Sequence, residues 1–458
     1  MSEQKTCLDF SDLPEVVWVR ILQYLPLKDR ARVGFTCRAL NRAFTNPVLW
    51  STLTLIFDCR YPSIALSDSY NDWAAYHSIQ IINRFGVYTK NFTIKVRGQK
   101  LSYELLSPFL HPLHAHRLNT MTLDIGNTTI PLAKHINRED TTFADISSLE
   151  LLTTFVNNAV KLKHLHISSW LILIKNSYGD MWNIFKSMIH NKNLVENLET
   201  LTLYWLERNA LAEREPVLPD PNETMTIIDH FKKLQCIGLR TPMIKRELIE
   251  MLASTSRRKL KTLKLLIHYI DPELNPNFRV PVIPPHLWKA LVNREPEFRI
   301  EVAIFLKTPE SELTNILTPE MPVSVVRYMK NSQIDMFTLS KLWNLYAPTL
   351  TVFHSFCDSY GLDKPLLHLV HECKHLSEII YYGTIYRSTV TALAKTRGRN
   401  WKVFEMKLVK TNFPRPDSDI YDDPVFSMQL VQMMKDVSNA LDRAWEPTEF
   451  LTEGSMFN

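Results

Sequence analysis

The chain has 458 residues and a formal net charge of +5, from 53 Lys and Arg against 48 Asp and Glu. This length allows two to four domains or one long repeat array, and a hydrophobic content of 45% excludes wholesale disorder. Glycine is scarce, with 10 residues in all. Since the closest pair is Gly86 and Gly98, the glycine-rich phosphate loops and the G-x-S-x-G elbow cannot form. Dinucleotide, P-loop and α/β-hydrolase chemistry are thereby excluded.

The pattern of cysteines and apolar runs bears on the cellular location of the protein. The 6 cysteines are scattered and form no C-x-x-C pair, which favours a reducing compartment over a disulfide framework or a zinc ribbon. The start of the chain lacks the apolar core of a signal peptide, and the strongest apolar run, residues 170–174, is too short to span a bilayer. Short basic groups at 257–259 and 395–402 indicate solvated faces. We expect a cytoplasmic or nuclear protein, or both, that binds no membrane and no nucleic acid.

Residues 8–50 predict three short helices. Ser11-Asp12 can cap the first, Pro14 suits its first turn, and Pro26 ends it. A second helix is expected through residues 29–33 and a third through 37–44. Three helices of this size cannot bury all their apolar side chains among themselves. Part of this surface is therefore expected to pack on the rest of the chain or on another protein.

In spacing and order this segment resembles the F-box family, although Leu40 stands where that family usually carries a tryptophan. The matching positions are Leu13, Pro14, Val17, Ile21, Leu22, Leu25, Pro26, Asp29, Val33, Cys37, Arg38 and Trp50. The resemblance implies docking to the S-phase-kinase-associated adaptor, which links F-box proteins to a cullin scaffold. It assigns the adaptor contact to Leu13, Pro14, Val17, Ile21, Leu22, Leu25, Leu27, Val33 and Cys37, with Arg38 at the edge.

Beyond residue 50 the motif L-x-x-L-x-L recurs and predicts short strands. The clear copies are 44, 36, 36 and 26 residues apart and begin at Leu118, Leu162, Leu198, Leu234 and Leu260. Weaker copies begin at Leu350, Leu376 and Trp401. Further strands are expected at 50–57, 298–305 and 324–329. A period of about 20–29 residues with this signature is typical of leucine-rich repeats, and the longer steps indicate inserted loops.

Helical patterns at 146–160, 246–252 and 389–393 precede these strands, so the strands should be parallel with right-handed crossovers. Proline-rich or polar stretches at 127–145, 207–225, 271–286 and 410–424 predict loops. The repeats lack the usual Asn after the strand and are degenerate. The predicted class is α/β, with a three-helix F-box at 8–54, an irregular leucine-rich-repeat solenoid (horseshoe) at 55–410, and a loop with a C-terminal helix at 411–458. A layered α/β sheet is the alternative fold.

Two histidine groups could in principle carry chemistry. His371-Glu372-x-x-His375 is a formal H-E-x-x-H, which on a helix binds zinc with the glutamate as general base. Lys374 disfavours a second cation nearby, and Cys373 stands where such repeats bury a cysteine, so we expect no metal there. His111, His114 and His116 have no Cys or acid at ligand spacing and indicate a solvated loop.

The sequence therefore predicts a non-catalytic interaction protein without a cofactor. The first hypothesis is a substrate receptor of a cullin-type ubiquitin ligase, with the F-box holding the complex and the repeats holding a target. The second is a repeat scaffold without a ligase role, and the third is the metallopeptidase. Because the strands should bury their apolar faces against each other, removal of residues 1–50 is expected to leave the array folded.

Overall fold

The computed structural model describes most of the chain. The described residues are 13–25, 27–59, 79–98, 103–111, 113–127, 146–169, 184–203, 221–254, 259–268, 282–305, 310–330, 332–410 and 424–447. The chain divides into two compact units. The first comprises Met1–Leu201 with Ala212–Val217, and the second comprises Thr202–Leu211 with Leu218–Asn458.

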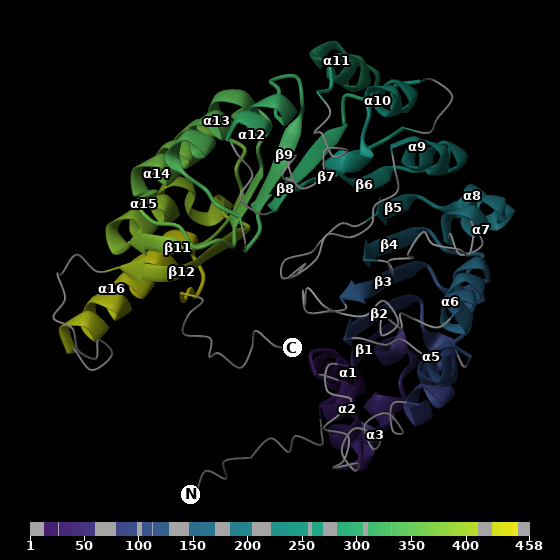
Figure 1. The fold of residues 1–458 in the computed structure, drawn as a ribbon. Helices are drawn as coiled ribbons and strands as arrows, with labels where there is room; N and C mark the ends of the chain where they lie inside the picture. Colours follow the sequence, from purple (N-terminus) through teal and green to yellow (C-terminus); the bar gives the residue numbers. More distant parts are fainter. Residues whose placement is uncertain are drawn as a thin grey trace, which may run out of the picture. The chain divides into compact units, whose positions relative to one another are not determined.

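The first unit begins with three helices and continues as a helix-and-strand repeat (Figure 1). Its helices are α1 (Glu15–Gln23), α2 (Leu27–Gly34), α3 (Arg38–Thr45), the 3-10 turn η2 (Pro47–Trp50), α5 (Tyr103–Leu110), α6 (Ile146–Asn157), α7 (Ile184–His190) and α8 (Lys192–Asn197). Its strands are β1 (Thr52–Cys59), β2 (Asn91–Gly98), β3 (Thr120–Asn127) and β4 (His164–Ser169), and the division between the units falls within β5 (Thr200–Leu203). Strands β1 to β4 pair in chain order, and every pair is parallel.

The second unit repeats the same arrangement, with helices along one side of its strands (Figure 1). Its strands are β6 (Cys236–Arg240), β7 (Thr262–His268), β8 (Arg299–Phe305), β9 (Val323–Tyr328), β10 (Val352–Ser355), β11 (Glu378–Tyr386) and β12 (Val403–Lys410). Its helices are α9 (Pro221–His230), α10 (Arg246–Leu252), α11 (Pro285–Arg294), α12 (Glu310–Ile316), α13 (Met336–Tyr346), α14 (Asp363–Glu372), α15 (Arg387–Arg397) and α16 (Pro424–Leu441). Strands β6 to β12 are also parallel and paired in chain order.

The recurring motif explains this fold. In the five clear copies its second and third apolar positions, for example Leu263 and Leu265 in β7, are at most 2% exposed. Neighbouring strands approach closely, and a Cβ at Gly238 would lie 2.8 Å from the Cβ of Thr202, so only glycine fits there without a shift. The predicted α/β repeat solenoid after a helical N-terminal segment is therefore confirmed.

Several details differ from the prediction. Strand β2 was not predicted, because Phe92 and Ile94 are buried without a preceding leucine of the motif. The loop predicted at 207–225 overlaps α9, which begins at Pro221, and the loop at 271–286 overlaps α11, which begins at Pro285. Residues 170–174, 257–258 and 411–423 lie outside the described residues.

The basic group at 395–402 is only partly solvated. The guanidinium of Arg397 donates to the carbonyl oxygens of Val370 at 2.9 Å and Cys373 at 2.6 Å, at the end of α14. Arg399 forms an ion pair with Asp442 at 3.1 Å. Arg397 thus stabilises the fold by satisfying the last carbonyls of a helix, whereas the exposed pair of Arg399 and Asp442 contributes little. Among the described helices, none has the length and apolar character needed to cross a membrane.

An aromatic cluster joins the N-terminal helices to the first repeat. The ring of Trp50 stacks on Phe85 with centroids 4.6 Å apart, and Phe44 meets both rings edge-on at 5.0 and 5.6 Å. The indole N–H of Trp50 donates to the carbonyl of Phe44 at 2.7 Å. Because the helices and the first repeat share this core, removal of residues 1–50 would expose Phe85 of the first repeat. That the array stays folded without these residues stays a prediction. The boundary predicted at residue 54 falls inside β1.

We predict that Trp50→Ala lowers the free energy of unfolding of the whole chain by about 3–5 kcal/mol, the usual cost of removing a buried aromatic ring. Chemical denaturation of the full chain measures this change. Val48→Ala is the matched control in the same turn, since Val48 is 58% exposed. Equal stability of the two variants would show that the helices and the first repeat are independent.

Candidate functional site

The helical segment is held in place by its own polar side chains. Arg30 of α2 reaches back to the end of α1, donating to the carbonyls of Leu25 at 2.7 Å and Gln23 at 3.0 Å. Asn41 donates to the carbonyl of Gly34 at 3.0 Å, and Asn46 donates to Glu15 at 2.7 Å. These bonds fix the angles between α1, α2 and α3. The surface of the segment is therefore preformed.

Helix α1 divides its apolar side chains between two environments. Val19 is 6% and Leu22 0% exposed, and both lie in the core with Phe44 and Trp50. Val17 and Ile21, four residues apart on another face, are 37% and 41% exposed. Within the described part of the chain this outer face stays exposed, so α1 offers an apolar stripe for a partner.

The predicted contact residues fall into three groups. Pro14, Val17, Ile21, Cys37 and Arg38 are exposed, and Leu13 is partly exposed. Leu25 and Val33 pack against the core while keeping some exposure. Leu22 is fully buried, so its assignment as a surface contact is corrected: it anchors α1 in the core instead. The side chain of Leu27 lies outside the described residues.

Sequence reasoning missed other exposed apolar residues of this segment. Tyr24 and Phe35 are each 75% exposed, Val16 is 73% and Val48 is 58% exposed. Tyr24 continues the stripe three residues beyond Ile21 and carries Arg20 over its ring, with the guanidinium 5.5 Å from the ring centroid. The family pattern does not include these positions. The helical spacing of Val17, Ile21 and Tyr24 could have identified the last of them.

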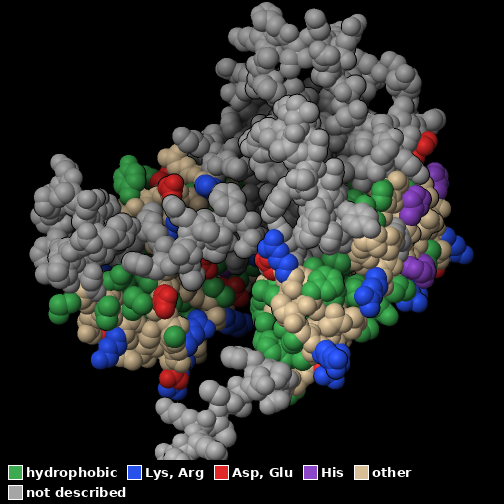
Figure 2. Space-filling model, turned by 90° about the horizontal axis from the view of Figure 1, so that it is seen from below, with side chains coloured by type: hydrophobic (Ala, Val, Ile, Leu, Met, Phe, Trp, Pro, Cys, Tyr) green, Lys and Arg blue, Asp and Glu red, His purple; other side chains and the backbone are tan. Residues whose placement is uncertain are grey.

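The same segment is basic. Residues 13–50 contain six Lys and Arg (Arg20, Lys28, Arg30, Arg32, Arg38 and Arg42) against two acids (Glu15 and Asp29), a formal charge of +4. Figure 2, which views the molecule from below, shows hydrophobic side chains interleaved with Lys and Arg on the side where α1 to α3 lie. The arrangement suits a partner that has apolar side chains ringed by carboxylates.

The H-E-x-x-H segment does not have the geometry of a zinc site. Helix α14 ends at Glu372, so His371 and His375 are not on one helical face; both are exposed. A hydrogen bond from His371 at 2.9 Å lowers the pKa of Glu372, the opposite of what a general base at neutral pH needs. Cys373 is buried as predicted, and burial raises the pKa of its thiol to about 12. In the described part of the chain, no three His, Cys, Asp or Glu side chains are placed to share a metal ion.

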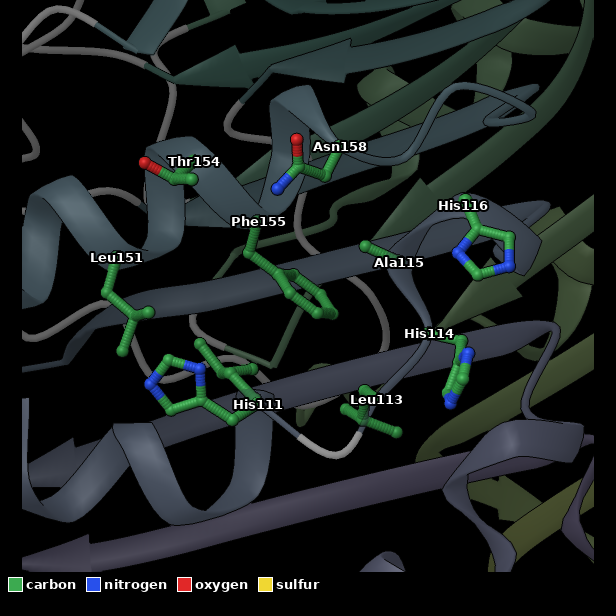
Figure 3. Close-up of a pocket in the computed structure, with 10 residues that line it drawn as sticks. His111, Leu113, His114, Ala115, His116, Leu151, Thr154, Phe155 and Asn158 are labelled. Atoms are coloured by element: carbon green, nitrogen blue, oxygen red, sulfur yellow. The ribbon is translucent and has the colours of Figure 1, made fainter.

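The other histidine group borders a hollow of about 610 Å³ between the end of α5 and α6 (Figure 3). His111, His114 and His116 are exposed as predicted, and Leu113 and Phe155 form an apolar floor. The hollow is open, and its lining contains no carboxylate and no Lys or Arg. It therefore offers hydrogen bonds from imidazole rings, and its lining residues do not pair an acid with these rings.

Comparison with known proteins agrees with this arrangement. The F-box-like family matches residues 10–56. F-box/LRR-repeat protein 21 from Bos taurus is 23% identical over 442 residues, covering 96% of this chain and 90% of the relative. F-box/LRR-repeat protein 8 from Homo sapiens is 20% identical over 422 residues, covering 88% of this chain and 96% of the relative.

Among solved structures, an internalin from Listeria monocytogenes matches 76% of this chain and 92% of its own, with 13% identity and a TM-score of 0.26, too low to support an argument. A narrower resemblance, to F-box only protein 39, rests on the strand at 50–57 and on the Cys-x-x-Leu of the repeat at 376, and stays a prediction. The F-box-like match at residues 10–56, the similarity to F-box/LRR-repeat proteins over most of the chain and the parallel repeats together support an F-box protein with leucine-rich repeats.

Proposed function

We propose that this chain is the substrate-recognition subunit of a cullin-RING ubiquitin ligase of the SCF type. The F-box would dock on the S-phase-kinase-associated adaptor, and the repeats would hold a target protein. The observation that carries the proposal is the split of α1, whose inner residues Val19 and Leu22 hold the fold while Val17 and Ile21 stay exposed. A helix that only capped the repeats would not need an exposed apolar stripe on its outer face.

The proposed mechanism is proximity. A target held on the repeats would have its lysines at high effective concentration near a carrier-bound ubiquitin. The chain would bind and orient, while bond formation would be left to other subunits. The proposal includes a cytoplasmic or nuclear location, in line with the scattered cysteines.

The adaptor contact is proposed for the exposed members of the predicted set, with Val17 and Ile21 at its centre. Tyr24 and Phe35 extend it, since aromatic side chains with 75% exposure are typical interface anchors. The charge of +4 on residues 13–50 would favour carboxylates around the apolar contact of the adaptor. The rival is a repeat scaffold whose helices only cap the array.

We predict that Val17→Asp with Ile21→Asp abolishes recovery of the adaptor and the cullin from cells, while the chain stays folded. Each carboxylate would be desolvated against an apolar partner, and anchor positions of this kind commonly cost about 2 kcal/mol or more. Both side chains are exposed, so the melting temperature should change little. Affinity purification followed by quantification of the adaptor provides the measurement. Leu25→Asp is less informative, because Leu25 also packs on the core.

Val431→Asp is the matched control, since Val431 is a 64% exposed β-branched residue on a helix of the second unit. It should recover the adaptor at the wild-type level. Wild-type recovery by the Val17 and Ile21 double variant would refute the docking assignment. Loss of thermal stability in that variant would instead favour a structural role and the scaffold hypothesis.

We predict that His371→Gln with His375→Gln changes neither the metal content of the purified chain nor its stability. Both side chains are exposed and His375 lies beyond the end of α14. Elemental analysis of the wild type and the double variant tests this. Stoichiometric zinc in the wild type that is lost in the variant would revive the metallopeptidase hypothesis.

A further inference from the structure

Exposed apolar side chains gather at one edge of the second unit. Among the described residues of this unit, seven large hydrophobic side chains are highly exposed, and four of them lie where a strand passes into the next helix. Met336 and Phe337 begin α13 with 53% and 63% exposure, Tyr360 precedes α14 with 83%, and Tyr386 ends β11 with 43%. We call these four residues the aromatic rim. The other three, Val282, Met428 and Val431, are on α16 or precede α11.

The members of the aromatic rim belong to three consecutive repeats. Strands β9, β10 and β11 are neighbours and parallel, so their carboxyl ends lie at one edge of the sheet. Helices α13, α14 and α15 stack next to each other on the outside (Figure 1). The rim therefore lies along one edge of the sheet, at the carboxyl ends of three neighbouring strands.

Hydrogen bonds between the repeats fix the junctions that carry the rim. The N–H of Tyr386 donates to the carboxylate of Asp363 at 2.8 Å, and the N–H of Thr384 donates to the carbonyl of Ser359 at 2.7 Å. On the other side, the N–H of Phe356 donates to the carbonyl of Tyr328 at 2.8 Å. Gly361, with φ +72°, makes the turn directly after Tyr360. A partner would thus meet aromatic side chains whose backbone is already ordered, which lowers the entropic cost of binding.

Charge at the rim cancels. The junctions and the first turns of the helices that follow them carry three acids (Asp335, Asp358 and Asp363) and three bases (Lys330, Lys364 and Arg387). The carboxylate of Asp335 caps α13 by accepting from the N–H of Thr338 at 2.8 Å, and that of Asp363 is bonded to Tyr386. The rim therefore offers no net charge by which to select an acidic, phosphorylated or basic ligand. What distinguishes it is its exposed apolar surface, rich in the side-chain types that dominate binding hot spots.

We propose that the aromatic rim holds a segment of the target protein that presents apolar side chains, and that this contact needs no phosphate or acidic group. The inference rests on the proposed function, because the repeats are there the part that holds a target. It names the edge used and the chemical class of the segment that fits it.

Three sets of short synthetic peptides serve as the probe for the full-length chain, with fluorescence anisotropy as the readout. The first set has Leu, Phe and Pro side chains separated by Ser and Gln. In the second set Glu replaces the spacers, and in the third phosphoserine does. The wild type should bind the first set, and neither anionic set should bind more tightly. Phe337→Ser with Tyr360→Ser should weaken binding of the first set about tenfold or more.

Val431→Ser is the matched control, since Val431 is equally exposed at 64% but lies on α16. It should bind like the wild type, and all three chains should melt at the same temperature. Three outcomes would overturn the proposal: no binding of the apolar set, equal binding by the rim variant, or about tenfold tighter binding of an anionic set by the wild type.

Adaptor recovery, measured on the same chains, separates this proposal from the proposed function. The rim variant should recover the adaptor like the wild type, because α1 is unchanged. Rim-dependent peptide binding by a wild-type chain that recovers no adaptor would refute the ligase role and leave the rim in place. Adaptor recovery with rim-independent peptide binding would refute the rim alone.

Discussion

A strand and its following helix cannot bury their own apolar faces, and the architecture of both units follows from this constraint. In the first unit the leading edge of the sheet is closed by the ring of Trp50 with Phe44 and Phe85. In the second unit the last strand is closed by α16 and by Trp445, whose indole N–H donates to the carbonyl of Phe404 at 2.9 Å. Both ends thus use a buried tryptophan whose one polar atom is satisfied by backbone, so that a large apolar area is covered without an unpaired donor.

The same constraint explains how α1 acquires two roles. Its inner face completes the aromatic cluster, and this fixes the helix against the first repeat independently of any partner. The outer face of α1, with Val17 and Ile21, stays exposed and does not pack in the core. The residues proposed for docking, Val17 and Ile21, can therefore be substituted with little effect on stability, whereas a change at Leu22 would disturb the fold and the proposed docking together. Loss of adaptor binding alone does not distinguish these two causes.

The repeat motif made most of the strands predictable. Strands β3 to β7 follow their leucines closely, because a buried L-x-L pair has few alternatives to a strand between helices. The motif failed at β2, where Phe92 and Ile94 fill the same inner positions without the leading leucine.

The exposure of individual side chains was harder to predict than secondary structure. The family pattern placed Leu22 among the contacts, and only packing against Phe44 and Trp50 identifies it as core. Likewise Arg240 at the end of β6 is 1% exposed, although arginine side chains are mostly exposed in folded proteins. Such distinctions depend on residues remote in sequence, which a local pattern does not contain.

The short passage from η2 into β1 has a mechanical consequence. Only Ser51 separates Trp50 from Thr52, and the carbonyl of Ser51 accepts from the N–H groups of Lys90 and Asn91, both at 2.9 Å. The passage is thus itself part of the sheet, and no linker exists at which the helices could swing. A partner bound to α1 would therefore have a fixed orientation relative to strands β1–β4, because the register of the sheet fixes α1. Inserting one residue after Trp50 would change the orientation of helices α1–α3 relative to the sheet, since the side-chain direction along a strand reverses at each residue.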